Sequence, residues 1–563
     1  MTSRSKQPFF HPKLLTTLRG YTAAQFREDA LAGVIVGFVA LPLAIAFGIA
    51  SGVTPGQGLV TAVVAGFLIS ALGGSRVQIG GPTGAFVVIL YAIGQKYGPG
   101  ALPVCALMAG VMLIGMGLLG MGSVIRFIPY PLTVGFTSGI AVIIFSGQVK
   151  DLLGLQTGPL PGDFVGNWKI YLESLHTADP VAIGLSAVCL AILMSWPKIS
   201  RRAPGPIVAL VAVTAAVWAF EIPVTTIGSR FGALPSGFAW PTWPALAPGA
   251  LRELIGPAFT VAMLGAIESL LSATVADGMI EGRHRSNTEL IAQGAANIAC
   301  GLFGGIPATG AIARTATNVK NGGRTPVAGI VHALTLLIIV LVFGSLARLI
   351  PLCVLAAILV IVSYHMSEWH SFLALLKAPR ADVAVLVVTF MLTVFVDLTV
   401  AVEVGMLLSL ILFMKRMTDV TSVRDVTLAM DETLDEESLR EKSDALARLH
   451  VPPGVAVYEA EGAFFFGVAE SLRDTMSFGA TPPKVTILRM RHVLTLDASG
   501  LRALTDLQRA CARMGGHLLL AGIHAQPLVA MERAGMLDTF GHENVFKSID
   551  AALKRAKALV SPS

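Results

Sequence analysis

The sequence predicts a polytopic α-helical membrane protein with a soluble α/β domain at its C-terminal end. Apolar runs long enough to cross a bilayer recur from Leu31 to Met414, and short buried strands alternate with amphipathic helices after Val451. Of the 563 residues, 54% are hydrophobic and 13% are charged, whereas soluble domains are roughly 25% charged. A multi-pass membrane domain is therefore expected.

Fourteen apolar runs precede residue 415, although several are too short to cross a bilayer alone. With a cytoplasmic N-terminus, thirteen Lys and Arg residues fall on inner loops and six on outer loops or span ends. The positive-inside rule therefore predicts that both termini are cytoplasmic. The runs cover about 31–50, 58–74, 79–94, 101–121, 127–149, 180–196, 205–222, 254–276, 288–304, 306–319, 327–349, 351–364, 382–398 and 399–414.

The composition divides the chain into four parts. Residues 1–28 are expected to be a cytosolic segment, 29–418 the membrane domain, 419–450 an acid-rich linker and 451–563 a small α/β domain. In the last part VAVYEA, KVTILRM and HLLLAG are predicted strands, and ASGLRALTDLQRACARMG and AQPLVAMERAGM are predicted helices.

Several functions are excluded by composition and motif. The net charge of +6 comes without a basic stripe of interleaved aromatic residues, so nucleic acid is not an expected partner. The five cysteines have neither CxxC nor Cys/His ligand spacing, which argues against a disulfide framework and a zinc site. No motif of a catalytic site occurs in a usable context. We therefore expect no enzyme, no metal and no cofactor.

An internal repeat connects two polar stretches within the apolar region. At an offset of 226 residues, Thr83-Gly84-Ala85 falls on Thr309-Gly310-Ala311, and residues 37–52 fall on 263–278 without gaps. The two motifs lie in the third and tenth runs, so corresponding runs cross the membrane in opposite directions. This predicts fourteen segments in a 7+7 inverted repeat, with a binding site where the two repeats meet.

The repeated motif predicts two broken helices whose N-termini face each other. Gly, Pro and Thr before a short apolar run suit extended backbone that changes into a half-helix near Thr83 and near Thr309. Two helix N-termini bind an anion without needing a cation. Arg314, about one turn into the second half-helix, is expected to attract the substrate. The alternatives are close helix packing by small residues and an Arg314 that pairs with a carboxylate.

Glu268 is a lone carboxylate within an apolar run. Such a group can carry a proton or bind Na⁺, and Ser272, one turn along the same face, can supply a neutral oxygen. The predicted coupling ion is therefore H⁺ or Na⁺, while a structurally paired or snorkelling carboxylate is the alternative. Phe47 is either a packing aromatic or a residue that lines the substrate cavity.

Taken together, these stretches resemble the sulfate permease (SulP) family of anion transporters. The resemblance implies fourteen segments in a mobile core and a gate domain, with elevator-like alternating access. It also implies a substrate site formed by Thr83, Gly84, Ala85, Gly310, Ala311 and Arg314, with Glu268, Ser272 and Phe47 beside it. The stretches that carry the resemblance are VALPLAIAFGIASG, GGPTGAF, GAIESLLSATVADG, SNTELIAQGAANIACGLFGGIPATGAIARTATNVKNGGRTPVAG and YHMSEWHSF.

The C-terminal part resembles a STAS domain through TLDASGLRAL. Relatives among anti-sigma antagonists carry a phosphorylated serine here, which makes Ser499 a possible regulatory phosphosite. The alternative is a helix N-cap built from Asp497 or Ser499. The resemblance also implies a homodimer, and it makes a regulatory protein a candidate partner of this domain.

The leading hypothesis is a secondary active transporter of a small anion in the cytoplasmic (inner) membrane of a bacterium. Sulfate, bicarbonate and C4-dicarboxylates are the candidate substrates, by resemblance to bacterial relatives. An anion exchanger or channel-like conductor on the same scaffold stays open as an alternative. A membrane receptor that signals through the STAS domain is a third hypothesis.

Overall fold

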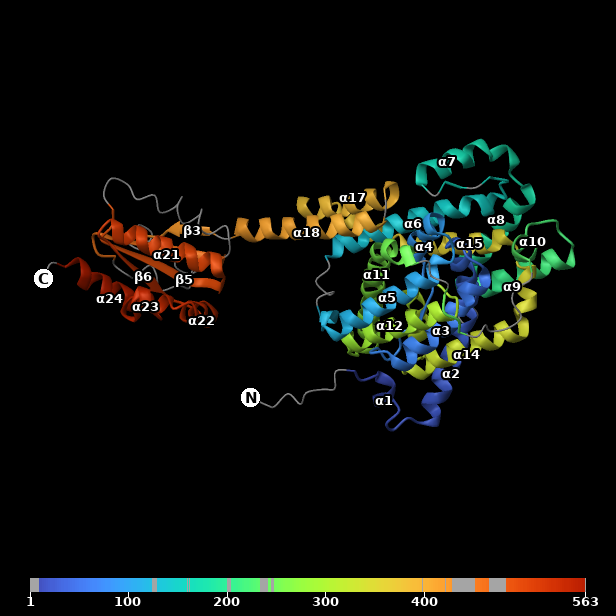
Figure 1. The fold of residues 1–563 in the computed structure, drawn as a ribbon, viewed down its shortest axis with the longest axis horizontal. Helices are drawn as coiled ribbons and strands as arrows, with labels where there is room; N and C mark the ends of the chain where they lie inside the picture. The colour runs from blue at the N-terminus through green and yellow to red at the C-terminus, as the bar shows by residue number, and fades with distance from the viewer. Residues whose placement is uncertain are drawn as a thin grey trace. The chain divides into compact units, whose positions relative to one another are not determined.

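Figure 1 shows the fold in a computed structural model of the chain. Two compact units divide at Ser409 and Leu410, and each is described by itself. Most of the expected linker 419–450 and the basic residues Arg126, Arg201 and Arg202, counted above on inner loops, lie outside the described residues. The described residues are 10–123, 129–158, 160–161, 163–199, 204–232, 241–244, 248–396, 398–420, 422–427, 451–464 and 482–561.

The first half of unit 1 is helical apart from one short strand. Its elements are α1 (Lys13–Thr17), α2 (Ala23–Ala50), α3 (Pro55–Leu72), β1 (Gly80–Gly81), α4 (Gly84–Tyr97), α5 (Ala101–Leu118), η1 (Met121–Ser123), α6 (Tyr130–Leu153), α7 (Phe164–Glu173), η3 (Leu175–Thr177), α8 (Pro180–Ile199), α9 (Gly205–Ala219) and α10 (Ile227–Phe231). Helix α2 continues through Pro42, so the proline does not divide it into two helices.

The second half repeats the same order of a long helix pair, a short strand and a short helix. Its elements are α11 (Pro248–Ile280), α12 (Ser286–Leu302), β2 (Thr309–Gly310), α13 (Ile312–Lys320), α14 (Pro326–Phe343), η4 (Gly344–Leu349), α15 (Leu352–Met366), α16 (Trp369–Leu375), α17 (Arg380–Phe395) and α18 (Leu398–Val420), of which the last crosses into unit 2.

The offset of 226 residues also relates helix boundaries. Gly84, the first residue of α4, falls on Gly310 in β2, two residues before α13 begins. Ala101, the first residue of α5, falls on Val327, one residue after α14 begins. These helix boundaries are thus related by nearly the same offset as the sequence motifs, while the 7+7 inverted repeat stays a prediction.

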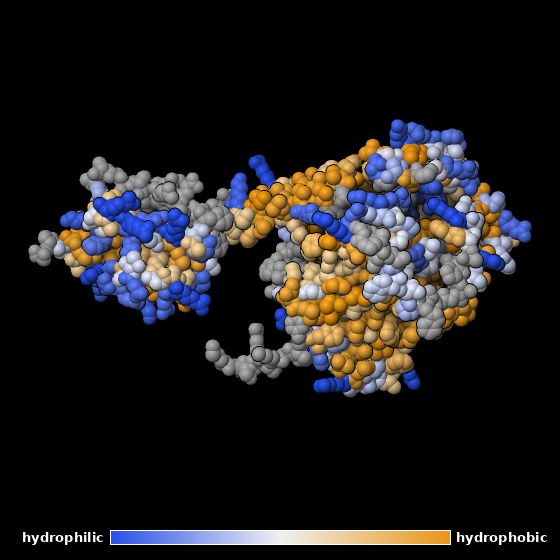
Figure 2. Space-filling model, in the orientation of Figure 1, coloured by the Kyte–Doolittle hydropathy of each residue, from blue (hydrophilic) through white to orange (hydrophobic). Residues whose placement is uncertain are grey.

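Among the described residues of unit 1, seven helices are long and apolar enough to cross a membrane. Three shorter apolar helices, 84–97, 180–196 and 205–219, accompany them among the described residues. Figure 2 shows apolar residues gathered over the middle of this unit, with hydrophilic residues towards the ends that carry α7 and α1. A helical transmembrane domain follows from these observations, while the count of fourteen segments stays a prediction.

Glycines allow the helices of unit 1 to pack closely. A Cβ on Gly110 of α5 would lie 2.6 Å from the carbonyl oxygen of Gly294 in α12, and a Cβ on Gly294 would meet Gly110 in the same way. Helix α2 approaches α14 through Gly33 and Gly37. Such contacts bring helices together where lipid gives no hydrophobic driving force between them. They join α2, α3, α5, α11, α12 and α14 into one packed group, while α6 packs chiefly with α15 and α17.

Unit 2 contains a five-stranded sheet in the order β3-β4-β5-β6-β7. The edge strand β3 is antiparallel to β4, and the other neighbours are parallel. The strands are β3 (Ser422–Asp425), β4 (Val455–Phe464), β5 (Val485–Leu496), β6 (His517–Ala521) and β7 (Val545–Phe546), and the helices are α21 (Ala498–Arg513), α22 (Ala525–Arg533), α23 (Met536–Phe540) and α24 (Ile549–Val560). The three strands and two helices predicted from sequence are confirmed by β4, β5, β6, α21 and α22.

The two faces of this sheet are covered by different helices. Leu518 and Leu520 of β6 face the cluster that includes α21, α22 and α23, whereas Leu519 and Ala521 face the cluster that includes α24. This alternation follows from the two-residue period of a strand. Because both faces are covered, residues 518–521 of the inner strand β6 form a continuous apolar run, as in buried parallel sheets.

Candidate functional site

Two glycine-containing segments far apart in the sequence form a two-stranded ribbon inside unit 1. Gly80 of β1 pairs with Gly310 of β2, and Gly81 pairs with Thr309, in antiparallel register. Because the strands run in opposite directions, α4 and α13 leave opposite ends of the ribbon in opposite directions. Both helices therefore start beside the ribbon, and the inverted arrangement of the two half-helices stays a prediction.

The two half-helices do not begin at equivalent residues. Helix α4 begins at Gly84 with Thr83 as its N-cap, which agrees with the sequence-based expectation. Helix α13 begins at Ile312 with Ala311 as its N-cap, three residues after Thr309, near which its start was expected. Thr309 is instead held in extended backbone by the pairing of β2 with β1, a contact that no local pattern reveals.

The start of α4 leaves polar groups available. The main-chain N–H groups of Gly84 and Ala85 have no main-chain acceptor in the described part of the chain. The Thr83 hydroxyl does not cap the helix, and its buried oxygen has no partner among the described residues. At α13 the N-cap Ala311 donates its N–H to the carbonyl of Ile79 at 2.8 Å, while the N–H groups of Ile312 and Ala313 likewise have no main-chain acceptor among the described residues. A helix N-terminus carries about half a positive charge, so the start of α4 favours an anion.

Arg314 lies in the first turn of α13 and is only 2% exposed. Its Nη2 donates to the carbonyl oxygen of Pro82, the residue before Thr83. Its Nη1 lies 2.6 Å from the position that a Cβ atom would occupy if residue 81 were not glycine. Nη1 has no hydrogen-bond partner among the described residues. The guanidinium therefore lies against β1, next to the N-terminus of α4. It adds a buried positive charge to that helix end.

A set of short polar contacts attaches β2 to α11. The hydroxyls of Ser269 and Thr309 are 2.7 Å apart, and the Thr309 hydroxyl donates to the Gly265 carbonyl at 3.0 Å. The Gly310 N–H donates to the Ser269 hydroxyl at 3.3 Å. The Thr309 hydroxyl is thus engaged with α11, whereas the equivalent Thr83 hydroxyl has no partner in the described part of the chain. Ser269 was not singled out in the sequence, because one serine in a small-residue helix gives no distinguishing signal.

The two residues expected to serve a coupling ion differ in their surroundings. Ser272 is fully buried and donates to the Thr315 hydroxyl at 3.3 Å, which in turn accepts the Ile79 N–H at 3.0 Å. Glu268 is partly exposed, and it forms no ion pair or hydrogen bond with any described residue. The carboxylate is therefore not paired with Arg314, which was the structural alternative for both residues.

Phe47 and Ala85 belong to the large buried apolar cluster of unit 1, to which α2, α4 and α11 all contribute. Phe47 is 4% exposed and Ala85 is 1% exposed. Helices α2 and α11 both pack against α4 and α13, so the expected neighbours of the site are present.

Gln78 is a second residue that the sequence did not distinguish. Its side chain is 3% exposed, and neither of its polar atoms has a partner among the described residues. Its Nε2 occupies the space that a Cβ on Gly310 would need. Position 310 therefore has to be glycine for Gln78 to pack beside the ribbon. A glutamine two residues before Gly80 could have been noted as a polar residue in an apolar run.

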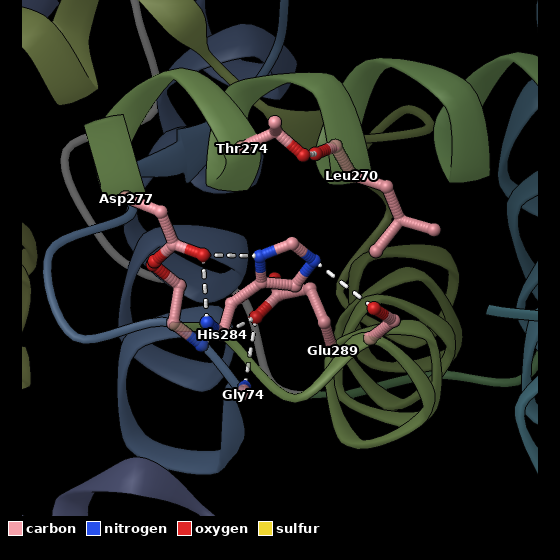
Figure 3. Close-up of polar contacts among 8 residues, drawn as sticks. Gly74, Leu270, Thr274, Asp277, His284 and Glu289 are labelled. Carbon is pink, nitrogen blue, oxygen red and sulfur yellow. Dashed lines mark hydrogen bonds and ion pairs between the residues drawn. The ribbon is translucent and has the colours of Figure 1, made fainter. Parts of the chain in front are cut away.

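Figure 3 shows a polar network that fixes the turn between α11 and α12. The Asp277 carboxylate accepts the main-chain N–H of His284 and contacts its ring Nδ1, each at 2.7 Å, while Ser286 lies 3.0 Å from Nε2. Glu289 of α12 accepts the Gly74 N–H at 2.8 Å. Because Gly74 precedes β1 by only a few residues, the network ties the ribbon to α12 and to the helix that holds Glu268.

In unit 2, Asp497 is the N-cap of α21, and its carboxylate accepts the Gly500 N–H at 2.8 Å. The capping alternative stated for this motif is therefore confirmed for Asp497. Ser499 is exposed in the first turn of the same helix. Its phosphorylation stays a prediction.

Comparison with known proteins decides the family. The sulfate permease family model matches residues 26–389, and the STAS domain model matches residues 447–552. The chain belongs to the sulfate permease family. "Putative sulfate transporter YvdB" of Bacillus subtilis is 40% identical over 534 residues, covering 94% of this chain and 98% of that protein.

Two solved structures agree with this fold. The transmembrane domain of the cyanobacterial bicarbonate transporter BicA is 31% identical with a TM-score of 0.61, covering 69% of this chain and 98% of that one. Murine Slc26a9, an anion transporter in the inward-facing state, is 19% identical with a TM-score of 0.86, covering 99% of this chain and 96% of that one. A member of the sulfate permease family with named transporters as relatives is a transporter and not an enzyme.

Proposed function

We propose that this sulfate permease family member is a secondary active transporter that carries a small oxyanion into the cell together with H⁺ or Na⁺. One observation supports this most: the β1–β2 ribbon presents the N-terminus of α4 next to a buried Arg314 that has no carboxylate partner among the described residues. Sulfate, bicarbonate and a C4-dicarboxylate are the candidates, because a helix N-terminus and one arginine attract any small anion.

The substrate-binding groups in this proposal are the free N–H groups of Gly84 and Ala85, the Thr83 hydroxyl and the Arg314 guanidinium. Phe47 forms an apolar wall. Thr309, Gly310 and Ala311 hold the ribbon in register, and they contribute through backbone rather than through free side chains. No cofactor takes part in the proposed mechanism.

Glu268 is the proposed coupling group. Among the described residues its carboxylate has no bonded partner, and it lies one residue from Ser269, which contacts β2 directly. Binding of a proton or Na⁺ there removes a negative charge from the surroundings of the anion, which favours loading of both together. Transport then proceeds by an elevator-like movement of the α2–α5 and α11–α14 group against the remaining helices.

We also infer that the termini are cytoplasmic, that the protein sits in the inner membrane of a bacterium and that it forms a homodimer. The positive-inside distribution supports the orientation. The STAS domain offers an exposed Ser499 as a candidate regulatory site and a surface for a regulatory protein.

Uptake by the purified protein in liposomes tests the function. Labelled sulfate, bicarbonate and fumarate are each supplied with an inward proton gradient, an inward sodium gradient or neither. Accumulation of one anion with only one gradient supports coupled transport. Movement only against a trapped counter-anion means exchange, and binding without any flux contradicts transport of these anions.

A further inference from the structure

Two neighbouring cavities lie at the end of unit 1 where α2, α4 and α6 end, the end that carries α7 (Figure 1). They have volumes of about 250 Å³ and 320 Å³ and share Lys150, Asp151 and Arg230. A water molecule takes about 30 Å³ of liquid. The first cavity therefore has room for a small oxyanion with part of its hydration shell.

The charges around the first cavity are unequally paired. Arg230 forms an ion pair with Asp151 at 2.9 Å, and Asp163 accepts the Gly166 N–H at 2.7 Å at the start of α7. Lys150 is half-buried, and its ammonium has no ion pair or hydrogen bond with any described residue. The lining of this cavity thus holds two cations and two carboxylates, and Lys150 is the cation there that forms no ion pair with a described residue.

Buried polar atoms around Lys150 also lack partners. The hydroxyls of Ser146 and Tyr171 and the side-chain oxygen of Asn167 line the first cavity, and the Thr157 hydroxyl lines the second. None of these atoms has a hydrogen-bond partner in the part of the chain that the structure describes. Buried polar atoms in proteins are almost always bonded, so a set of unmet ones indicates water or a ligand. Three of the four are hydroxyls, which can donate to an anion together with the ammonium.

The first cavity reaches towards the ribbon site. Val87 and Val88 of α4 line it, within about one helical turn of Gly84. Ile144 of α6 lines it too, and its Cδ1 lies 3.1 Å from the position of a Cβ on Gly84. An apolar side chain therefore stands between this cavity and the N-terminus of α4. Met366, whose Sδ lies 2.7 Å from the same Cβ position, also borders Gly84 but does not line the cavity, so Ile144 both lines the cavity and borders the start of α4.

We propose that the cavity around Lys150 is a second anion site, which holds the small oxyanion on the side of the membrane opposite the N-terminus before Ile144 lets it pass. This proposal rests on the proposed transport function. Lys150 supplies the charge, and the hydroxyls of Ser146 and Tyr171 supply neutral donors. A purely structural role is the competing explanation, because a lysine in the last turn of α6 also stabilises the helix C-terminus.

Side-specific kinetics of the full-length protein distinguish the two roles. Uptake is measured in intact cells, where the anion arrives from outside, and in inverted membrane vesicles, where it arrives from the cytoplasmic side. We expect Lys150→Gln to raise the half-saturating outside concentration about tenfold, as loss of one partly desolvated charge predicts. The half-saturating concentration on the cytoplasmic side should be unchanged. Lys150→Arg should restore the half-saturating outside concentration to the wild-type value. Lys96→Gln is the matched control, because Lys96 lies in the last turn of α4 at the same end of the unit and lines neither cavity.

A shift of equal size on both sides, no shift, or the same shift in Lys96→Gln would overturn the proposal. A lower Tm of Lys150→Gln with unchanged kinetics overturns it as well, in favour of the structural role. If the wild-type protein moves no anion, the proposed function fails on its own, and equilibrium binding of labelled sulfate to the purified protein then tests the site. Two anions per wild-type chain and one per Lys150→Gln chain support it, and equal numbers contradict it.

Discussion

Arg314 of α13 donates a hydrogen bond from Nη2 to the carbonyl oxygen of Pro82, which precedes the N-cap of α4. One half-helix thus places its only charged first-turn residue at the start of the other. Burial of a guanidinium is energetically costly unless its N–H groups are hydrogen-bonded. This contact satisfies Nη2, while Nη1 has no hydrogen-bond partner among the described residues. This hydrogen bond connects α13 with the segment before α4, and it leaves the Nη1 group of Arg314 available to donate to a ligand.

Arg314→Ala is expected to reduce anion uptake at least tenfold with little loss of folded protein. A charge-assisted hydrogen bond to an anion contributes about 1.5–3 kcal/mol, and Arg314→Lys, which keeps the charge but loses the planar fork, should retain part of the activity. Uptake in liposomes measures the effect. Lys320→Gln, an exposed cation at the end of the same helix, is the control and should transport normally.

Gly81→Ala should abolish transport nearly as completely as loss of Arg314. Gly81 has φ of 146°, and an added Cβ would meet Arg314 Nη1 at 2.6 Å. Side chains rarely adopt this conformation, and the guanidinium would have to leave β1. Gly98→Ala is the matched control, because Gly98 also has a positive φ of 83° but has open space around it. Equal loss of uptake in both variants would show that backbone strain alone explains the effect.

Tyr21→Phe should lower the free energy of unfolding by about 1 kcal/mol at neutral pH, the usual value of one hydrogen bond. The Tyr21 hydroxyl donates to the Asp29 carboxylate at 2.7 Å. The same carboxylate accepts the main-chain N–H of Arg324, two residues before α14 begins. Burial, together with this bond, raises the pKa of Tyr21 to about 12.

Because the folded pKa of Tyr21 lies above the ordinary value near 10, its contribution is fully present below pH of about 10 and is lost as the pH rises through about 12. Thermal unfolding in detergent at pH 7 to 11 should therefore show a constant difference between wild type and Tyr21→Phe that shrinks only above pH of about 10. Tyr130→Phe, at a tyrosine that is 56% exposed, should match wild type throughout. A difference that is largest at high pH would contradict this account.

Asp497→Ala should destabilise α21 by about 1 kcal/mol, the typical effect of losing an N-cap, whereas Ser499→Ala should have almost none. Hydrogen exchange of the α21 peptides in the full-length protein separates the two. A phosphate on Ser499 would lie in the first turn of the helix, where negative charge is favoured. Faster exchange in Ser499→Ala than in Asp497→Ala would mean that the serine, and not the aspartate, caps this helix.

Sequence reasoning predicted the features that depend on local pattern. The Thr-Gly-Ala motifs and the offset of 226 residues located both half-helices, because broken helices need glycine and proline. Strands of the STAS domain were recognised, because a sheet covered on both faces requires continuous apolar runs.

Non-local contacts were beyond sequence reasoning. The pairing of Gly80 with Gly310 depends on register between distant segments, and the partner of Arg314 is a main-chain carbonyl that any residue would supply. Ser269 contacts Thr309 of β2, whereas Ser272 contacts Thr315 of α13. Which serine contacts β2 depends on the position along α11 at which the ribbon packs against it. The spacing of serines along α11 in the sequence does not give this position.

Glu268→Gln should retain anion binding and lose dependence on the coupling ion. Among the described residues the carboxylate has no bonded partner, so its replacement by a neutral isostere breaks no ion pair and leaves the fold intact. Uptake in the presence of the proton or sodium gradient should fall to the level measured without any gradient. Exchange of labelled for unlabelled anion should continue. Glu281→Gln, at an exposed glutamate just after α11, should keep full gradient dependence. If Glu268→Gln still accumulates the anion against its gradient, coupling resides elsewhere and Glu268 has a structural role.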